Sequence, residues 1–266
     1  MTTTDLAREE WPSELYVEAW KAFRSLSNEN EVTAEHLVTR PSWPKRNDLV
    51  LCDLGCGDGK LVEQIVLRSI STVREVRLID PDEDLLNEAV RVVSETGLVK
   101  SVLRSLATAE QAFPACAASS DALLLVHVVY LMKNGGFKRL LDACPRDTPL
   151  FVVMDAPTSV FTELWSVTAP KYHQRSLRAH ETIAQLHGKD GYLVSESRIA
   201  SRIADPRGQR ADLKTTLLSM LCYTDARTLA QDDALMSQVE EILGRHNVVG
   251  DALTIQCESV CYEISR

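Results

Sequence analysis

A glycine-rich turn between an apolar run and a helical pattern constrains this sequence more than any other feature. The segment "DLGCGDG" covers residues 53–59 and has a glycine at every second position from its third residue on. Residues 49–54 form an apolar run, which is typical of a buried strand, and residues 59–69 show helical spacing. A turn without side chains leaves its backbone open to a ligand. The segment therefore predicts a strand–turn–helix unit that holds a small molecule against its backbone.

Apolar runs and helical patterns alternate through the first 155 residues. The other apolar runs lie at 75–80, 121–126 and 149–155, a weaker run lies at 100–105, and helical spacing follows at 82–95 and 133–143. Near-continuous apolar strands with helices between them are typical of a parallel sheet buried on both faces. Later in the chain, two strand-like runs at 191–203 and 252–265 alternate with a period of two, as strands at a sheet edge do. The pattern predicts an α/β fold.

Charge and cysteine content exclude several classes of protein. A net charge of −9 argues against a nucleic-acid partner, because neutralising phosphates takes clustered Lys and Arg. The seven cysteines show no framework spacing and no metal-ligand spacing, so we expect a reduced, cytoplasmic chain without a bound metal. No apolar run approaches the roughly 20 residues that a membrane helix needs, and the N-terminus lacks the apolar region of a signal peptide. We therefore expect no membrane partner.

The spacing of the glycines differs from that of a dinucleotide site, which is G-x-G-x-x-G. The pattern D-x-G-x-G-x-G resembles motif I of the class I S-adenosylmethionine-dependent methyltransferases. This resemblance implies a Rossmann-like, seven-stranded sheet with helices on both faces, an antiparallel last strand and a helical lid. It also implies S-adenosyl-L-methionine as the cofactor, with Asp53 near its ammonium group and with Gly55, Gly57 and Gly59 lining the turn. An ordinary glycine-rich turn is the alternative interpretation.

A second acidic residue stands where the cofactor's ribose would need it. The second strand ends at Asp80, about 20 residues beyond the glycine turn, and a carboxylate there can accept two hydrogen bonds from a ribose diol. The neighbouring Asp82 is better placed to cap the following helix. After the third strand, Thr108 and Ala109 resemble the residues that lie near the adenine ring in the family.

The rest of the chain resembles histamine N-methyltransferase and its relatives over nearly the full length. The similar segments are "YVEAWKAFRSLSNENE", "VHVVYLMKN", "TSVFTELWSVTAPKY", "ADLKTTLLSMLCY" and "TIQCESVCYEI", which occur in the family's order. The resemblance implies substrate contacts at Tyr16, Trp20, Glu29, Tyr130, Phe161, Trp165 and Cys257. It also places His127, where the family has a glutamine, between cofactor and substrate. Cys257 stands at or near the position of a family asparagine, so histamine itself is in doubt.

Four of the residues expected at the substrate could instead have a purely structural role. Tyr16 and Trp20 are four residues apart on one helix face, which is as typical of a core as of a pocket. Glu29 alone would be an ordinary surface acid, and His127 could be a satisfied polar group inside the sheet. As site residues, Glu29 would hold or deprotonate the substrate, and His127 would act as a general base because its ordinary pKa is near neutral.

We expect residues 1–266 to form one methyltransferase domain. Its predicted parts are an N-terminal helical lid (1–47), a cofactor-binding core (48–155), a lid insertion (156–190) and strands and helices that complete the sheet (191–266). The predicted function is methyl transfer to a small molecule by a monomer, with an amine or imidazole nitrogen as the favoured acceptor. The alternatives are an O-methyltransferase for a carboxylate or hydroxyl, and a non-catalytic protein of the same fold. An aminopropyl transferase is disfavoured, because no acidic run follows residues 121–126.

Overall fold

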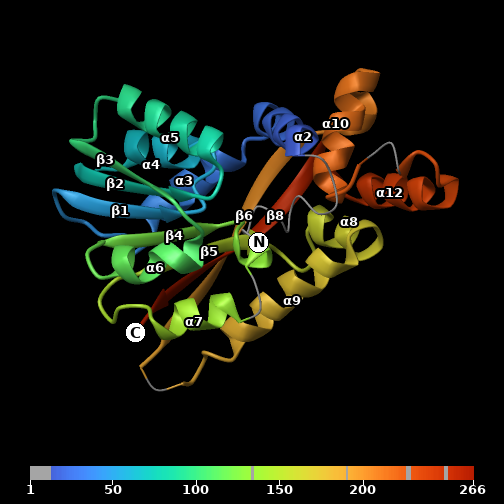
Figure 1. Cartoon of the computed structure of the whole chain (residues 1–266). Coiled ribbons are helices and arrows are strands. Elements are labelled where there is room, and N and C mark those ends of the chain that lie inside the picture. The colour runs from blue at the N-terminus through green and yellow to red at the C-terminus, as the bar shows by residue number, and fades with distance from the viewer. Residues whose placement is uncertain (1–12, 133–134, 190, 226–228, 249–250) are drawn as a thin grey trace.

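The computed structural model describes residues 13–132, 135–189, 191–225, 229–248 and 251–266. One mixed sheet runs through it in the order β3-β2-β1-β4-β5-β8-β6 (Figure 1), and the two-residue strand β7 pairs with β8. The strands are β1 (Leu49–Leu54), β2 (Val73–Asp80), β3 (Ser101–Leu106), β4 (Ala122–Val126), β5 (Leu150–Asp155), β6 (Leu193–Ala204), β7 (Asn247–Val248) and β8 (Asp251–Ser265). The first five strands are parallel to one another, and β8 is antiparallel to β5 and β6. The predicted α/β class and the antiparallel last strand are confirmed.

Helices cover both faces of this sheet and one end of it. They are α2 (Ser13–Leu26), α3 (Glu29–Thr39), α4 (Lys60–Arg68), α5 (Glu83–Glu95), α6 (Ala109–Ala117), α7 (Gly136–Asp142), α8 (Val160–Thr168), α9 (Pro170–Ala184), α10 (Ala211–Cys222) and α12 (Asp233–Arg245). Two single 3₁₀ turns, η1 (Val129–Leu131) and η2 (Pro206–Gly208), complete the described elements. The helix predicted at 133–143 is described from Gly136 onward.

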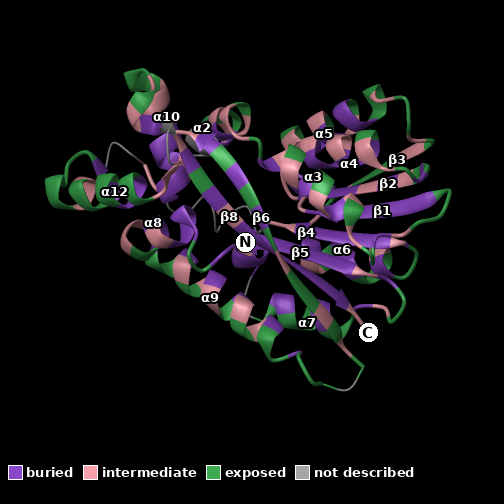
Figure 2. Cartoon of the chain, turned by 180° about the vertical axis from the view of Figure 1, so that it is seen from behind, coloured by how far each residue is buried: buried purple, intermediate pink, exposed green. Residues whose placement is uncertain are grey.

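Three apolar clusters show how these layers pack. One joins the sheet to α6, α7 and α9, and a second joins its other face to α3, α4 and α5. Strands β1 and β5 are buried throughout (Figure 2), because helices cover both of their faces. Edge strand β3 is half-buried or exposed, which explains why its apolar run is weak in the sequence. The third cluster fills the helical end of the molecule, with α2, α8, α10 and α12 around it.

The two predicted lid regions divide between that end and the sheet. Within 1–47, of which residues 1–12 lie outside the described part, α2 joins the helical end, whereas α3 packs Ala34 and Leu37 into the layer of α4 and α5. Within 156–190, α8 joins the helical end, whereas α9 packs Ala179 and Ile183 against the other sheet layer. The helical end is therefore built mainly from α2 and α8 with two later helices. No described helix combines the length and the hydropathy needed to cross a bilayer.

Candidate active site

The turn from β1 to α4 needs its glycines for two different reasons. Gly55, Gly57 and Gly59 all have positive φ, at 87°, 54° and 75°. A Cβ on Gly55 would lie 2.4 Å from Cγ2 of Val128, beside the carboxyl end of β4, so only a bare backbone fits there. A Cβ on Gly59 would instead lie 2.7 Å from Cα of Ala89, so this glycine lets α4 and α5 approach each other. Gly59 was predicted to line the cofactor turn, but the structure places it between these two helices.

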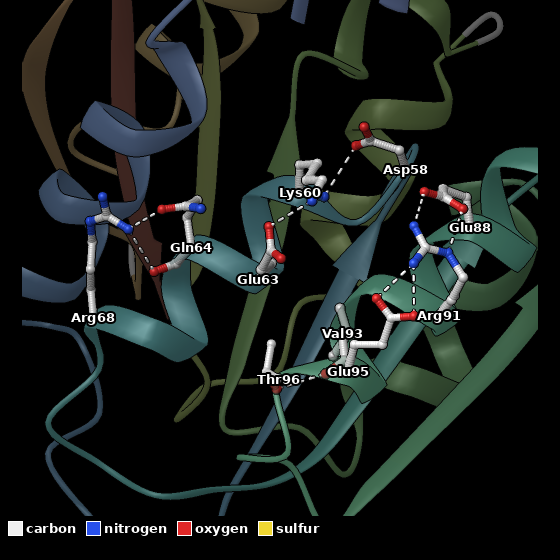
Figure 3. A network of polar contacts seen from close by, with 10 residues as sticks. All are labelled: Asp58, Lys60, Glu63, Gln64, Arg68, Glu88, Arg91, Val93, Glu95 and Thr96. Atoms are coloured by element: carbon white, nitrogen blue, oxygen red, sulfur yellow. Dashed lines mark hydrogen bonds and ion pairs between the residues drawn. The ribbon is translucent and has the colours of Figure 1, made fainter. Parts of the chain in front are cut away.

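The start of α4 is fixed by local polar contacts (Figure 3). The carboxylate of Asp58 accepts a hydrogen bond from the backbone N–H of Lys60 at 3.1 Å, and the ammonium of Lys60 pairs with Glu63 at 3.1 Å. Along α5, Arg91 pairs with Glu88 and Glu95, one turn away on either side. The side chains of Arg91, Glu88 and Glu95 are exposed, so these ion pairs lie on the outer surface of α5.

Asp80, at the carboxyl end of β2, holds the glycine turn from the side. Its Oδ2 accepts a hydrogen bond from the N–H of Gly57, and its Oδ1 accepts one from the N–H of Asp82, both at 2.9 Å. Burial raises the pKa of Asp80 to about 6. Asp82 caps α5 by accepting hydrogen bonds from the N–H groups of Asp84 and Leu85, which confirms its predicted role.

Asp53 is a buried carboxyl group without a full set of partners. Its Oδ1 is buried, and no described residue donates a hydrogen bond to it. Burial, and next the negative charge of Asp80, raise the pKa of Asp53 to about 7. An unpartnered carboxylate in a dry site is costly unless a cation approaches it. Asp53 lies one residue before the end of β1 and is not among the lining residues of the two cavities described next.

A cavity of about 180 Å³ opens beside the turn, at the carboxyl ends of the parallel strands. Six residues predicted to hold the cofactor line it: Gly55, Gly57, Asp80, Thr108, Ala109 and His127. Thr108 begins α6 with a capping box, in which its Oγ1 accepts a hydrogen bond from the N–H of Gln111. The carboxyl ends of parallel strands are where α/β sheets bind their ligands.

A second cavity, of about 60 Å³, reaches into the helical end. Predicted substrate residues line it, namely Trp20, Glu29, Tyr130, Phe161 and Trp165, together with His127. The aromatic walls meet edge to face, with ring centroids 5.0 Å apart for Tyr130 and Trp165. Cys257 is buried nearby but does not line this cavity, and the side chain of Tyr16 lies outside the described residues. The indole Nε1 of Trp165 donates a hydrogen bond to the carbonyl of Leu221 at 3.1 Å, which fixes its ring.

The two cavities share part of their walls. Four residues line both of them: Trp20, Arg24, His127 and Leu131. Two come from α2 and two from the segment after β4. A molecule in the first cavity and a molecule in the second would therefore meet at this junction.

A buried chain of charges crosses the junction. The guanidinium of Arg24 donates a hydrogen bond from Nη1 to Oε2 of Glu29 at 2.8 Å. Oε1 of Glu29 lies 3.1 Å from Nε2 of His127, and Nδ1 of His127 lies 3.5 Å from Oδ2 of Asp155. His127 directly follows β4 with a φ of 56°, an uncommon conformation for a residue with a side chain. Its backbone N–H donates a hydrogen bond to the carbonyl of Val153 at 2.8 Å, which holds it in this conformation.

The charges in this chain are fixed by their neighbours. Burial would lower the pKa of His127, but the carboxylates of Glu29 and Asp155 outweigh burial and raise it to about 10. Burial would raise the pKa of Glu29, but the charges of His127 and Arg24 and the hydrogen bond from Arg24 lower it to about 2. At neutral pH, His127 is thus an imidazolium and Glu29 a carboxylate. To act as the predicted general base, His127 would first have to give up this proton, and the role stays a prediction.

Sequence reasoning missed Arg24 and Asp155. Arg24 stands four residues after Trp20 on the same face of α2, so helical spacing could have pointed to it. Asp155 is the last residue of β5, and the end of a parallel strand is a place to look for ligand contacts. Within the described ranges, no group of three or more His, Cys, Asp or Glu side chains is arranged to hold a metal ion.

Comparison with known proteins identifies the class of fold. No protein-family model matches the chain, and no curated protein matches its sequence. A putative methyltransferase from Bacillus halodurans is similar in structure, with a TM-score of 0.55 and 12% identity over 89% of this chain and 98% of that one. An S-adenosylmethionine-dependent methyltransferase from Geobacter sulfurreducens has a TM-score of 0.53 and 13% identity over 97% of this chain and 99% of that one. The plantazolicin methyltransferase BamL has a TM-score of 0.51 and 13% identity over 95% of this chain and 90% of that one.

These likenesses, together with the strand order, show the fold of the class I methyltransferases, as the glycine motif predicts. The strand order is the seven-stranded one expected, with the short β7 added beside β8. The narrower resemblance to histamine N-methyltransferases gains no support from these structures and stays a prediction.

Proposed function

We propose that this protein is an S-adenosylmethionine-dependent methyltransferase that acts on a small molecule. The observation that carries the proposal is the pair of cavities that meet at Trp20, Arg24, His127 and Leu131. One cavity lies against a glycine turn and an acidic strand end, and the other is walled by aromatic rings. The similar structures support the choice of cofactor, because the Geobacter enzyme and BamL both hold S-adenosyl-L-homocysteine, the demethylated product.

The residues of the first cavity suit this cofactor. The Oδ1 of Asp53, which accepts no hydrogen bond from a described residue, would accept one from the ammonium group. Each oxygen of Asp80 accepts one backbone N–H and keeps a second lone pair, which the ribose diol would use. Thr108 and Ala109 would lie near the adenine. When bound, the cofactor supplies a methyl group that its sulfonium has already activated.

A protein that catalyses methyl transfer of this kind must position the acceptor and exclude water. An in-line displacement needs the acceptor's lone pair about 3 Å from the methyl carbon, and exclusion of water favours it. Tyr130, Phe161 and Trp165 supply a rigid aromatic wall for that purpose. Direct transfer requires no nucleophilic side chain. Glu29 and His127 would act as fixed charges that orient the acceptor, because each already has oppositely charged partners.

An amine or imidazole nitrogen is the proposed acceptor. Aromatic faces attract cations, and the carboxylate of Asp155 lies at the same cavity, so both suit the positive charge of a methylated nitrogen. A carboxylate or hydroxyl oxygen is the second candidate. It is favoured by a different observation, namely that the two cationic groups of Arg24 and His127 also line this cavity. The BamL structure contains a triazolic desmethylplantazolicin analogue, an organic ligand of that enzyme.

Isothermal titration with S-adenosylmethionine and S-adenosylhomocysteine tests the cofactor. We expect micromolar binding that Asp80→Ala weakens at least tenfold, about 1.4 kcal/mol. Asp142→Ala is the matched control, because Asp142 is exposed and lines neither cavity. Failure of the wild type to bind either ligand would refute the proposal.

A methyl-transfer screen then tests the acceptor. Amines and imidazoles are screened first, and acids and alcohols next, each with radiolabelled cofactor. Transfer to nitrogen supports the first candidate and transfer to oxygen the second. Cofactor binding without transfer to any class would favour a non-catalytic, cofactor-binding protein.

A further inference from the structure

On the basis of the proposed function, we infer that Arg24 binds the carboxylate of the cofactor's amino-acid end. The ammonium of that end is assigned to Asp53, so the two residues would together recognise an α-amino acid zwitterion. Arg24 comes from α2, outside the β1–α4 unit that carries the glycine motif. The inference adds a residue from the N-terminal helices to the cofactor site.

The guanidinium of Arg24 is held beside the glycine turn by aromatic rings. Its Cζ lies 5.1 Å from the ring centroid of Trp20 and 5.7 Å from that of Phe23. The Trp20 ring itself closes over the turn, since a Cβ on Gly57 would lie 3.1 Å from its Cζ2. Arg24 therefore faces the part of the cavity where the backbone of the turn is bare.

Among the described residues, the hydrogen bonds of Arg24 all come from one nitrogen of the guanidinium, Nη1. Nη1 donates to Oε2 of Glu29 at 2.8 Å and to Oδ1 of Asn30 at 2.7 Å. Nε is buried, and no described residue accepts a hydrogen bond from it. The edge formed by Nε and Nη2 is one that can bind a carboxylate through two parallel hydrogen bonds. Glu29 and Asn30 thus orient the group while this edge stays available.

The charges around the cavity also point to Arg24 as the partner of a carboxylate. Its described lining includes the acids Asp80, Asp82 and Glu110 and the cationic groups of Arg24 and His127. His127 is already enclosed by Glu29 and Asp155, so its charge is neutralised on both sides. Arg24 has one described carboxylate partner, Glu29, which it shares with His127, so it is the cation better suited to a further anionic group. For the ammonium group, Oδ1 of Asp53 is a buried hydrogen-bond acceptor without a donor among the described residues.

Two ligands that differ only in the carboxylate, and a third that lacks the amino-acid chain and the sulfonium charge, test the assignment by calorimetry. They are S-adenosylmethionine, its decarboxylated analogue, and 5′-methylthioadenosine, which lacks both the carboxylate and the ammonium. We expect the wild type to prefer S-adenosylmethionine over the decarboxylated analogue at least tenfold. Arg24→Gln should bring that ratio close to one and leave the affinity for 5′-methylthioadenosine unchanged.

Arg210→Gln is the matched control, because it makes the same substitution at an exposed arginine that lines neither cavity. It should retain the wild-type ratio. The inference is overturned if the wild type binds both charged ligands equally, or if Arg24→Gln weakens all three ligands by one common factor. A wild type that binds none of the three refutes the proposed function instead.

Discussion

Nε2 of His127 lies 3.1 Å from Oε1 of Glu29, while the other ring nitrogen faces Asp155. This arrangement joins the start of α3 to the carboxyl ends of β4 and β5 through buried charges. It also favours the protonated form of the histidine at this position. Two carboxylates stabilise its imidazolium, and Arg24 completes the balance on the far side of Glu29.

We expect the imidazole of His127 to stay protonated through neutral pH. The neighbouring carboxylates raise its pKa to about 10 despite burial. Nuclear magnetic resonance of the histidine ring protons, with His127→Asn to assign the signal, measures this directly. A His127 signal that titrates near pH 6.5 would contradict the ion-pair chain.

Thermal stability should fall at alkaline pH through the same residue. The pKa of His127 is higher in the folded than in the unfolded chain, so its stabilisation is complete below about pH 6.5 and is lost as pH rises through about 10. Glu29 has the opposite sign, and its stabilisation is present above about pH 4.5 and is lost as pH falls through about 2. We expect the Tm of the wild type to drop more steeply between pH 7 and 10 than that of His127→Asn.

A control for that experiment is His187→Asn, which changes an exposed histidine. It should reproduce the alkaline drop of the wild type. Parallel curves for the wild type and His127→Asn would show that the pair does not contribute.

Cofactor affinity should depend on pH through Asp53. Burial raises the pKa of this carboxyl to about 7, and only the carboxylate can pair with an ammonium group. The affinity for S-adenosylhomocysteine should therefore fall about tenfold per pH unit below pH 7. The comparison ligand is 5′-methylthioadenosine, which has no ammonium and should lack this part of the dependence. Calorimetry on Asp53→Asn should show the same small slope for both ligands.

Alanine at Gly57 should weaken cofactor binding, whereas alanine at Gly97 should not. Both glycines have positive φ, at 54° and 66°, so each substitution should cost about 1–2 kcal/mol of folding free energy. Only at Gly57 would the new Cβ meet a side chain, the Trp20 ring at 3.1 Å, whereas no atom lies within 4 Å at Gly97. Chemical denaturation and calorimetry separate the two effects. Equal cofactor affinity in both variants would contradict a site against this turn.

The strands and the glycine turn were readable from sequence because their signals are local. The apolar run at 49–54 coincides with β1, and the acid at the end of the next run is Asp80, whose carboxylate holds the turn. The surfaces against which α3 and α9 pack could not be predicted from the sequence. Helical spacing shows that a helix buries one face, but not which surface covers that face.

The electrostatics of the site were beyond sequence reasoning for a different reason. The pKa of His127 depends on Glu29 and Asp155, which are far away in the chain and adjacent only in the fold. The steric role of Gly59 could not be predicted from the sequence either. The motif suggests three equivalent glycines, yet the neighbour that requires the third one is Ala89, on the following helix.

The contact between Gly59 and Ala89 matters to anyone who would transplant this motif. In the sequence, the motif is one short continuous segment, residues 53–59. In the folded chain, the last of them must be a glycine because the backbone of α5 at Ala89 lies where a Cβ would stand. A graft into another scaffold would have to carry the close spacing between the two helices along with the glycines.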